Sequence, residues 1–597
     1  MSTKHFFPDT NGVVVRALNS IVARNPHLEH DEANRVVFSK THPPSKVTII
    51  SGGGSGHEPA WAGYVGDGML TASVAGEVFA SPSTKQVMAA IRNAPSDAGV
   101  ILCITNYTGD RLHFGLAREK THALGQKIAQ IPLTDDVALG RKKSELLGRR
   151  GLAGNVLVLK LLGAAAHESW SFEECWKLGS EVNAQLATIG TSLDHCHIPG
   201  RTHHESIDDA ACVLGMGIHN EPGLRKISPM PSPHDLIQEM LLYVLDPNDS
   251  DRAFVKFSPE DDIALLINNF GGLSNLELEA LTQIALEQLD NDWKIKPCRI
   301  YSGMFETSLN GPGFSLTLGN LSNVATSVNR AVSELLRLLD APTSAPAWPR
   351  SGYGQPVNIS EEAANRRAKA RAEAEKVGQD LKGPEAPPSL LLALSTACNA
   401  AMAEEPNITK YDIQMGDGDC GEAVAGVCKA LLASMKAAPF VTKAPSLFAC
   451  LAAINSTLED MGGSLGAILS ILLTAFAGNL QRAAVSQPSF KLDVASIEDA
   501  SGEALDALKA YTGAREGDRT VMDALIPWCE SLQYSKDVSK ALSAAEEGAK
   551  KTAGMKPRFG RATYVGEVKD GEAMPPDPGA YAVAVFLRGL VEGGGWA

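Results

Sequence analysis

Basic residues are scarce and scattered in this chain. Its 597 residues include 54 Lys and Arg against 69 Asp and Glu, a formal net charge of −15, and no run of Lys or Arg forms a basic block. A protein that binds nucleic acid needs such a block to neutralise phosphates. The composition therefore argues against nucleic acid as a partner. Any bound nucleotide is expected to be held by backbone N–H groups, isolated cations and metal.

The chain also lacks paired cysteines and long apolar runs. Its ten cysteines include no CxxC pair and stand mostly in apolar stretches, which is typical of reduced, buried thiols. The first ten residues lack the charged start and apolar stretch of a signal peptide, and the longest apolar run, residues 467–478, is too short to cross a bilayer. We expect a cytoplasmic protein with no membrane partner.

The length and composition indicate more than one folded domain, since 44% of the residues are hydrophobic and 21% are charged. Residues 1–340 alternate short β-branched runs with helical patterns, which predicts a mostly parallel sheet covered by helices. The clearest strands are expected at residues 47–50, 99–105 and 263–270. Each runs into a small-residue turn, and ligands bind at such strand ends in open α/β sheets.

The composition changes after residue 340. Between residues 341 and 388, Pro-rich pieces flank a charged, alanine-rich segment at 360–376, which predicts a linker containing a helix. From Ser389 onward no convincing strand is found, so the second domain is predicted to be all-α. Its helices are expected at 389–404, 421–437, 446–459, 463–479, 500–511, 520–532, 537–554 and 580–593.

Three aspartates crowd the segment YDIQMGDGDCGE, residues 411–422: Asp412, Asp417 and Asp419. Carboxylates this close repel one another unless they share a hard cation, and Mg²⁺ is usually held by a few carboxylates and phosphate oxygens. A calcium loop or a solvated acidic turn is the alternative, although an EF-hand would need a 12-residue spacing closed by a glutamate. We predict a magnesium-binding turn that leads into a helix.

The glycine-rich segment SGGGSGHEP, residues 51–59, follows the first strand. It would let a phosphate, a dinucleotide or a small polar substrate approach the backbone. A dinucleotide site needs GxGxxG and an acidic residue after the next strand, whereas this turn carries His57 and Glu58. Asp110 in NYTGD and His219 in GMGIHNEPG have similar surroundings. The three could supply an acid, a base and a nucleophile if the fold brings them together, or each could be structural.

A histidine-rich segment, DHCHIPGRTHH, covers residues 194–204. Its spacing fits no standard zinc pattern, so a flexible surface loop is expected there.

The motifs taken together resemble the ATP-dependent dihydroxyacetone kinases, also called glycerone kinases. The resemblance extends over nearly the whole chain, with the motifs in the family's order. It implies a multi-domain fold in which an N-terminal α/β substrate domain of two subdomains, residues 1–340, is joined by the linker 341–388 to a C-terminal all-α eight-helix barrel, residues 389–597, that binds ATP. The matching motifs are SGGGSGHEPAWAGYVGDGML (51–70), FASPS (79–83), NYTGDRLHFGLA (106–117), GRRGLAGNV (148–156), GMGIHNEPG (215–223), GDGDCG (416–421), GGSLGA (462–467), GDRTVMDAL (517–525) and GRATYVG (560–566).

The resemblance implies phosphate transfer from Mg-ATP to dihydroxyacetone, and also to glyceraldehyde, with dihydroxyacetone phosphate as the product. His219 would attack the ketone carbon through its distal ring nitrogen and hold the substrate as a hemiaminal, which glycerol cannot form. Asp110 would accept the proton of the attacking hydroxyl, and His57 would orient or protonate the substrate. The pocket would be lined by Gly54, Ser55, Gly56, His57, Asp110 and His219.

The resemblance places ATP and two Mg²⁺ ions on the second domain. Asp412, Asp417 and Asp419 would bind the metal, and Arg561 is the candidate for a direct phosphate contact. The full set of implied nucleotide contacts is Cys420, Gly421, Glu422, Ala423, Ser464, Leu465, Gly513, Met522, Arg561, Asp577, Pro578 and Gly579.

Two residues depart from the family's pattern. Thr105 stands where many members have a lysine that contacts the substrate, and Leu465 replaces a small hydroxyl residue. Two other activities remain open: cleavage of FAD to cyclic FMN, as in animal members, and a dihydroxyacetone-binding regulator. Retention of the three aspartates and Arg561 argues against the regulator. A homodimer with domains exchanged between chains is expected from the resemblance.

Overall fold

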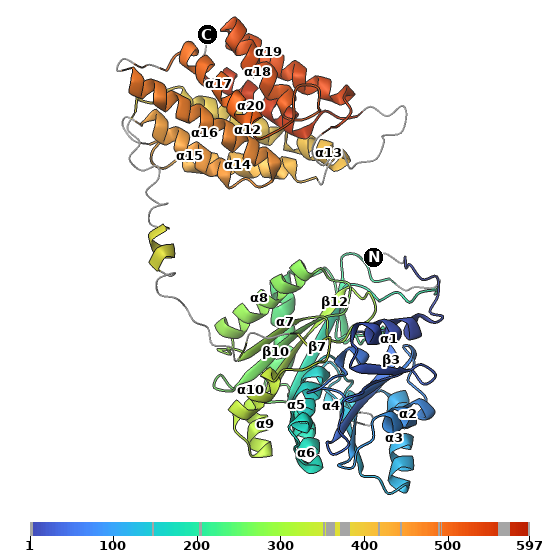
Figure 1. Cartoon of the computed structure of the whole chain (residues 1–597). Coiled ribbons are helices and arrows are strands. Elements are labelled where there is room, and N and C mark those ends of the chain that lie inside the picture. Colours follow the sequence, from blue (N-terminus) through green and yellow to red (C-terminus); the bar gives the residue numbers. More distant parts are fainter. Residues whose placement is uncertain are drawn as a thin grey trace. The chain divides into compact units, whose positions relative to one another are not determined.

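A computed structural model describes residues 4–145, 148–201, 206–349, 353, 365–370, 383–415, 418–441, 445–487, 490, 492–558 and 574–594. Asp417, Arg561 and most of the predicted linker helix lie outside these residues. The chain divides into two compact units, Met1–Val357 and Asn358–Ala597, which Figure 1 colours from blue to yellow and from yellow to red.

The first unit is built on two six-stranded sheets (Figure 1). The strand order is β1-β2-β4-β3-β5-β6 in the first sheet and β11-β10-β12-β7-β8-β9 in the second. The strands are β1 Leu28–Asp31, β2 Val36–Ser39, β3 Thr48–Ser55, β4 Ala72–Val78, β5 Val100–Thr105, β6 Ile128–Leu133, β7 Leu186–Ser192, β8 Cys212–Leu214, β9 Arg225–Ile227, β10 Ile263–Asn269, β11 Arg299–Gly303 and β12 Gly313–Asn320.

The two sheets differ in strand direction. In the first, β3, β4, β5 and β6 pair in parallel, as predicted. In the second, only β10 and β11 are parallel, and the other pairs are antiparallel. The prediction of a mostly parallel sheet was therefore wrong for this half. Strands that are buried on both faces are continuous apolar runs in either direction, so their composition does not distinguish the two arrangements.

Helices cover both faces of each sheet. Side chains of α2 and α3 pack on one face of the first sheet, and those of α7 and α8 pack on one face of the second. The layer between the sheets contains α1, α5, α6, α9 and α10. The helices are α1 Val13–Arg24, η1 Ala62–Tyr64, α2 Thr84–Asn93, α3 Thr108–Ala123, α4 Arg141–Ser144, α5 Asn155–His167, α6 Phe172–Ala184, α7 Pro233–Leu245, α8 Asn275–Asn291, α9 Leu321–Val328 and α10 Val332–Asp340.

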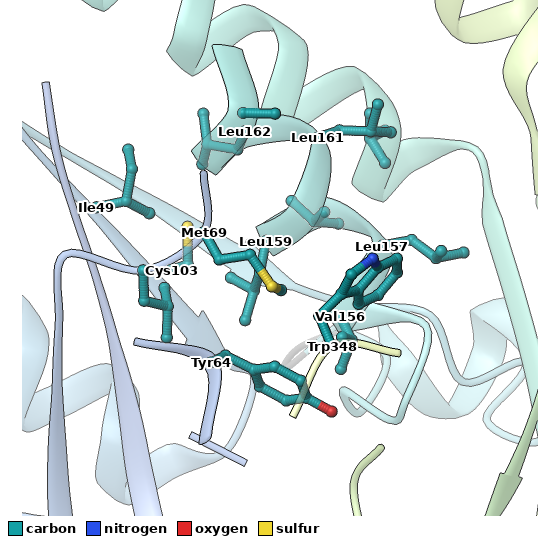
Figure 2. Close-up of a cluster of buried hydrophobic side chains, with 14 of the residues drawn as sticks. Ile49, Tyr64, Met69, Cys103, Val156, Leu157, Leu159, Leu161, Leu162 and Trp348 are labelled. Atoms are coloured by element: carbon teal, nitrogen blue, oxygen red, sulfur yellow. The ribbon is translucent and has the colours of Figure 1, made fainter. Parts of the chain in front are cut away.

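Helix α5 is the centre of this middle layer. Its residues from Asn155 to Ala166 are all buried, because it is apolar all round and has protein on every side. Figure 2 shows Leu159 and Leu162 of α5 in a cluster with Ile49 of β3 and Cys103 of β5. The helix therefore holds the two sheets in one core.

The segment predicted to begin the linker packs on the first unit instead. Trp348 is 8% exposed and lies in the same core cluster, with its ring 5.0 Å from that of Tyr301. The buried Lys160 ammonium donates hydrogen bonds of 2.8 Å to the carbonyls of Leu338 and Ala341. The predicted boundary at residue 340 is thus too early. Residues 341–348 are rich in Pro and Ser but pack on the first unit.

The second unit is all-α over its described residues, as predicted. The helices are α12 Leu390–Ala403, α13 Glu405–Met415, α14 Cys420–Ser434, α15 Leu447–Glu459, α16 Gly463–Ser486, α17 Val494–Lys509, α18 Met522–Ser535, α19 Val538–Lys551, η2 Thr552–Gly554 and α20 Pro578–Gly594.

Helix α13 was not predicted, because the acidic segment that begins at residue 411 was interpreted as a turn, whereas residues 411–415 form the end of this helix. The eight other long helices match the expected stretches, although α16 extends to Ser486 and α17 begins at Val494. Apolar side chains of α12, α14, α15, α16, α17, α18 and α20 line a cavity of about 380 Å³. Among the described helices, α16 alone is long and apolar enough to cross a membrane. Its apolar side chains on the cavity wall account for that composition.

We expect Gly163→Ala to destabilise the first unit by about 1–3 kcal/mol. A Cβ atom at Gly163 would overlap the backbone of Met69. Gly115→Ala on α3 is the matched control, because nothing lies within 4 Å of its Cβ position, and a helical Gly→Ala change is stabilising by about 0.5–1 kcal/mol. Chemical unfolding of the full chain measures both. Equal shifts in the two variants would contradict the packing described.

Candidate active site

Two histidines from different sheets meet in the first unit. His57 follows β3, and His219 lies in the loop between β8 and β9. Their Nε2 atoms are 3.0 Å apart, and the ring planes are perpendicular. Phe79 stacks on the His57 ring, and the Tyr107 ring meets the edge of His219 at 4.6 Å. The fold thus brings together two of the predicted site residues that are 162 positions apart.

The proton positions on His57 follow from its partner. Its Nδ1 lies 2.7 Å from the Thr307 carbonyl oxygen, and a carbonyl only accepts, so Nδ1 carries the proton. Burial, together with the neighbouring His219, lowers the pKa of His57 to about 3. The ring is therefore neutral at physiological pH and presents a lone pair on Nε2. This arrangement suits a hydrogen-bond acceptor for a substrate hydroxyl better than a proton donor.

Glu221 determines which nitrogen of His219 is free. The backbone N–H of His219 donates to its Oε2 at 2.9 Å, and the ring Nδ1 lies 3.3 Å from Oε1. Burial acts to raise the pKa of Glu221, but the His219 contacts and the charge of Arg150 lower it to about 2. An ionised carboxylate favours the Nδ1–H tautomer, which leaves a lone pair on Nε2. Two lone pairs then face each other, so a proton or an electrophile between them is stabilising.

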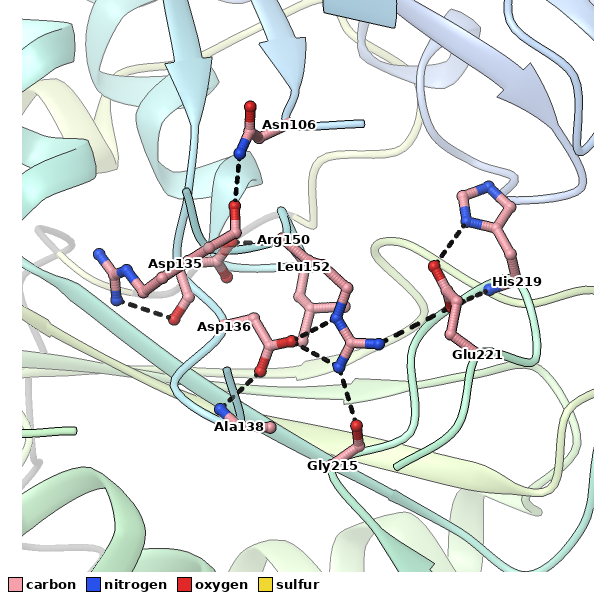
Figure 3. Close-up of polar contacts among 10 residues, drawn as sticks. Asn106, Asp135, Asp136, Ala138, Arg150, Leu152, Gly215, His219 and Glu221 are labelled. Atoms are coloured by element: carbon pink, nitrogen blue, oxygen red, sulfur yellow. Dashed lines mark hydrogen bonds and ion pairs between the residues drawn. The ribbon is translucent and has the colours of Figure 1, made fainter. Parts of the chain in front are cut away.

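Figure 3 shows that an ion-pair network supports this loop. Arg150 donates from Nε to Asp136 at 2.7 Å and from Nη2 to the Gly215 carbonyl at 2.8 Å. Its Nη1 lies 3.9 Å from Glu221. Both side chains of the Asp136–Arg150 pair are largely buried. The network connects the segment after β6 to the loop that carries His219.

Asp110, the third predicted residue, lies in the first turn of α3 and is 5% exposed. Its Oδ1 has no hydrogen-bond partner within the described ranges. Burial raises the pKa of Asp110 to about 6, against the opposing effects of a Ser81 hydrogen bond and of His219. The carboxyl is therefore close to the protonation midpoint expected of a general base near neutral pH.

The surroundings of Gly54 and Gly56, two glycines of the predicted pocket, leave no room for a side chain. A Cβ atom at Gly54 would lie 2.9 Å from the Ala80 nitrogen, and Gly56 has φ of +103°. The strand β3 continues through Ser55, where a turn was predicted. The Ser55 hydroxyl donates to the Gly76 carbonyl at 2.9 Å, so its side chain joins β3 to β4.

The histidine-rich segment is hydrogen-bonded to Asn220, the residue that follows His219. The backbone N–H of Cys196 donates to the Asn220 side chain at 2.9 Å, which donates back to the Cys196 carbonyl at 3.1 Å. Within the described residues no group of three metal-binding side chains is found. The described residues 194–201 lie in a loop that these two hydrogen bonds connect to Asn220.

The predicted nucleotide contacts fall at the starts of helices in the second unit. Those helices are α14, α16, α18 and α20. The first N–H groups of a helix have no partner within the helix and favour anions, although the Cys420 N–H already donates to Asp412 and the Met522 N–H to Thr520. A Cβ atom at Gly579 would lie 3.7 Å from Leu465 and 3.6 Å from Val521, so three of these starts meet. The first turn of α14 contains Cys420, Gly421, Glu422 and Ala423, that of α16 contains Ser464 and Leu465, and α18 begins with Met522. Asp577 directly precedes α20, which begins with Pro578 and Gly579, and Gly513 lies in the exposed loop before α18.

Carboxylates gather around Cys420. Burial and the charges of Asp412, Asp577 and Asp419 raise the pKa of its thiol to about 12. Asp412 is buried on α13 and accepts the Cys420 backbone N–H at 3.0 Å, while Asp419 is exposed at the start of α14. Burial raises the pKa of Asp577 to about 6. Negative charge therefore concentrates at this end of the unit, where a hard cation would relieve the repulsion.

Sequence analysis missed a buried cation at the same end. Arg519 is 1% exposed and donates to the carbonyls of Thr552 and Pro575. Its Nη1 makes no hydrogen bond in the described part of the chain, and its charge acts to lower the pKa of Asp577. The motif GDRTVMDAL contains it, but its burial depends on contacts more than 30 residues away.

The chain matches two domain families, Dak1 over residues 19–347 and DAK2 over residues 414–592. The dihydroxyacetone kinase of Pichia angusta is 40% identical over 99% of this chain and 98% of its own length. Dihydroxyacetone kinase 1 of Saccharomyces cerevisiae is 40% identical over 99% of both chains. The triokinase/FMN cyclase of Homo sapiens is 34% identical over 99% of both.

A solved structure matches the whole chain. The dihydroxyacetone kinase from C. freundii, in complex with AMP-PNP and Mg²⁺, covers 99% of this chain and 100% of its own, with a TM-score of 0.60 and 27% identity.

We predict that Glu221 controls the tautomer of the His219 ring. In wild type, ¹⁵N NMR of the histidine-labelled full chain should find the proton on Nδ1. Glu221→Leu should move it toward Nε2, because the acceptor is lost, whereas Glu221→Gln should keep it on Nδ1. Glu239→Leu, which removes a carboxylate paired with Arg225, is the control. An Nε2–H ring in wild type would contradict the assignment.

Proposed function

The chain belongs to the dihydroxyacetone kinase family, and from this premise we propose that it transfers the terminal phosphate of ATP to dihydroxyacetone held covalently on His219. The product is dihydroxyacetone phosphate. The observation that carries the covalent step is the contact of His219 Nδ1 with Glu221, which leaves the lone pair on Nε2, the nitrogen that faces His57 at 3.0 Å.

Addition of His219 to the ketone conserves atoms and charge. Nε2 bonds to the carbonyl carbon while the π electrons of the carbonyl move to oxygen. The oxygen gains a proton as Nδ1 loses one, and Glu221 lies at the nitrogen that releases it. The result is a neutral hemiaminal. Glycerol has no carbonyl and cannot react, so selectivity comes from bond formation rather than from pocket shape.

Two further residues act on the bound ketone. Asp110 accepts the proton of the hydroxyl that attacks the phosphate, and its unpartnered Oδ1 supports this role. His57 accepts a hydrogen bond from the substrate through Nε2, which orients it without protonating it. Gly54, Ser55 and Gly56 complete the proposed pocket. Gly54 and Gly56 let the segment of Phe79 and Ala80 pack against the end of β3, and Phe79 stacks on the ring of His57.

ATP binds on the second unit in this proposal. The starts of α14, α16, α18 and α20 provide N–H groups for the phosphates, and Arg561 adds a cation. The crowding of Asp412 and Asp419 around Cys420 fits a hard cation, and together with Asp417 they would hold two Mg²⁺ ions. Bound Mg²⁺ neutralises charge on the transferring phosphoryl group.

Three further features belong to the same proposal. Glyceraldehyde is a second acceptor, since it also has a carbonyl. The protein acts in the cytoplasm, for which the ten cysteines without disulfides are the support. A homodimer with exchanged domains is supported by the division of the two half-sites between two units.

The pH profile should depend on Asp110. A base works only when ionised, and the pKa of Asp110 is about 6, so kcat/KM should be constant above pH 6 and fall about tenfold per unit below it. Initial rates with dihydroxyacetone between pH 5 and 8 measure the profile. Asp110→Asn should lower kcat by 100-fold or more and remove the acid limb. An unchanged limb in that variant would assign it to another group.

Selectivity for ketone over glycerol should depend on His219. ATP consumption with dihydroxyacetone, glyceraldehyde and glycerol is compared for wild type, His219→Gln and Glu239→Leu. Wild type and the Glu239→Leu control should phosphorylate both carbonyl compounds but not glycerol, whereas His219→Gln should lose most of the preference. Continuous electron density between dihydroxyacetone and a side chain other than His219 would refute the covalent role.

A further inference from the structure

One residue beside the histidine pair has a strained backbone. Phe79, which directly follows β4 and opens the motif FASPS, has φ of +57°, a left-handed conformation that bulky residues rarely adopt. Its N–H donates to the Ser55 carbonyl at 2.8 Å, and the N–H of Ala80 donates to the Glu77 carbonyl at 3.0 Å. Such strain persists where the surrounding structure enforces it, and it is concentrated at functional sites. The place of the Phe79 ring indicates what the strain achieves.

The Phe79 ring contacts both histidines. It stacks on His57, with ring centroids 5.1 Å apart and planes at 11°, and it meets His219 at 5.0 Å with planes at 85°. The two histidine rings are themselves perpendicular, at 4.7 Å. Phe79 is therefore parallel to one histidine and perpendicular to the other, which are the two arrangements that aromatic rings prefer.

The segment that carries His57 is shaped to receive this ring. A Cβ atom at Gly56 would lie 2.7 Å from Cε1 of Phe79, and a Cβ atom at Gly54 would lie 3.1 Å from the Phe79 carbonyl carbon. The backbone angles of a residue set the direction in which its side chain leaves the chain. The left-handed conformation of Phe79 therefore directs its ring to the histidines, and the two glycines leave room for it.

The rest of the motif is fixed on both sides of the ring. Ser81 hydrogen-bonds Asp110, and its Oγ lies 2.6 Å from the position of a Cβ atom at Gly109. Ser83 caps α2 and forms a capping box with Gln86. A side chain on such a constrained segment can hold its neighbours more precisely than one on a loose loop.

Hydrogen bonds alone do not fix the orientation of either histidine. His57 is held at Nδ1 by a backbone carbonyl at 2.7 Å, and His219 is held at Nδ1 by Glu221 at 3.3 Å. One such contact determines the tautomer, but the ring can still tilt about it, and the tilt decides where the Nε2 lone pair points. Ring contacts from Phe79, and from Tyr107 to His219 at 4.6 Å, restrict this tilt.

We propose that Phe79 is a positioning residue that fixes the mutual orientation of the His57 and His219 rings. The inference rests on the proposed function, in which Nε2 of His219 adds to the ketone and Nε2 of His57 accepts a hydrogen bond from it. Addition needs the reacting atoms aligned at about 3–3.5 Å, and a misplacement of about 1 Å costs about 100-fold in rate. Phe79 has no group that takes part in this chemistry, so it acts through the two rings that it contacts.

The kinetic test compares Phe79→Leu with Phe172→Leu in the full chain. Both phenylalanines are half-buried in the first unit, and Phe172, at the start of α6, has the Lys127 ammonium over its ring. Phe79→Leu should lower kcat/KM for dihydroxyacetone about 10- to 100-fold. It should leave KM for ATP unchanged, because the nucleotide is proposed to bind the other unit. Phe172→Leu should change neither. An equal kcat/KM for dihydroxyacetone in the two variants would overturn the proposal.

A crystal structure of Phe79→Leu tests the positioning without turnover, so failure of the kinase proposal would not affect this result. The planes of His57 and His219 should depart from 90° or adopt more than one orientation. ¹⁵N NMR should still find the proton on Nδ1 of both rings, because Thr307 and Glu221 remain. Rings that keep the wild-type orientation would refute the role of Phe79. If Phe79→Leu does not fold, Phe79→Gly replaces it, because glycine adopts this φ without strain, and the same changes are expected.

Discussion

A single guanidinium, that of Arg150, connects the end of the first sheet to the loop that carries His219. It binds Asp136 after the first sheet, the Gly215 carbonyl before the His219 loop, and approaches Glu221 within that loop. These contacts are buried, so their desolvation is offset only while all partners are in place. Loss of Arg150 would leave Asp136 and Glu221 as neighbouring uncompensated charges. The loop and the tautomer of His219 both depend on this one cation.

Each ring of the histidine pair has a fixed acceptor at Nδ1. The Thr307 carbonyl holds the proton of His57 on Nδ1, and the Glu221 carboxylate does the same for His219. Thr307 is 250 residues from His57, whereas Glu221 is two residues from His219. The tautomer of His57 therefore depends on the packing that brings the segment after β11 to the end of β3. The tautomer of His219 is determined within its own loop.

The sequence predicted the second unit better than the second sheet. Helical periodicity depends on local residues, so eight of the long helices were located, whereas α13 was missed because its last turn carries Asp412 and leads into glycines. His57, Asp110 and His219 were found because each follows a strand or stands in a glycine-rich loop. Arg150 was not, because its significance depends on Asp136 and Gly215, which are 14 and 65 positions away. Glu221 was also missed, although it lies two residues from His219. Asp417 and Arg561 remain predictions.

In the proposed function, the ketone site and the phosphate site require different electrostatic surroundings, and each unit supplies one of them. The proposed ketone site needs a neutral His57 and an Asp110 whose pKa is near 6, both of which depend on burial, and an ionised Glu221, which depends on His219 and Arg150 against burial. The phosphate site needs helix N-termini and clustered carboxylates that attract metal from solvent. A divalent cation placed beside Asp110 would lower its pKa and weaken it as a base. Because the carboxylate cluster belongs to the other unit, a metal bound there does not act on the pKa of Asp110 within the first unit.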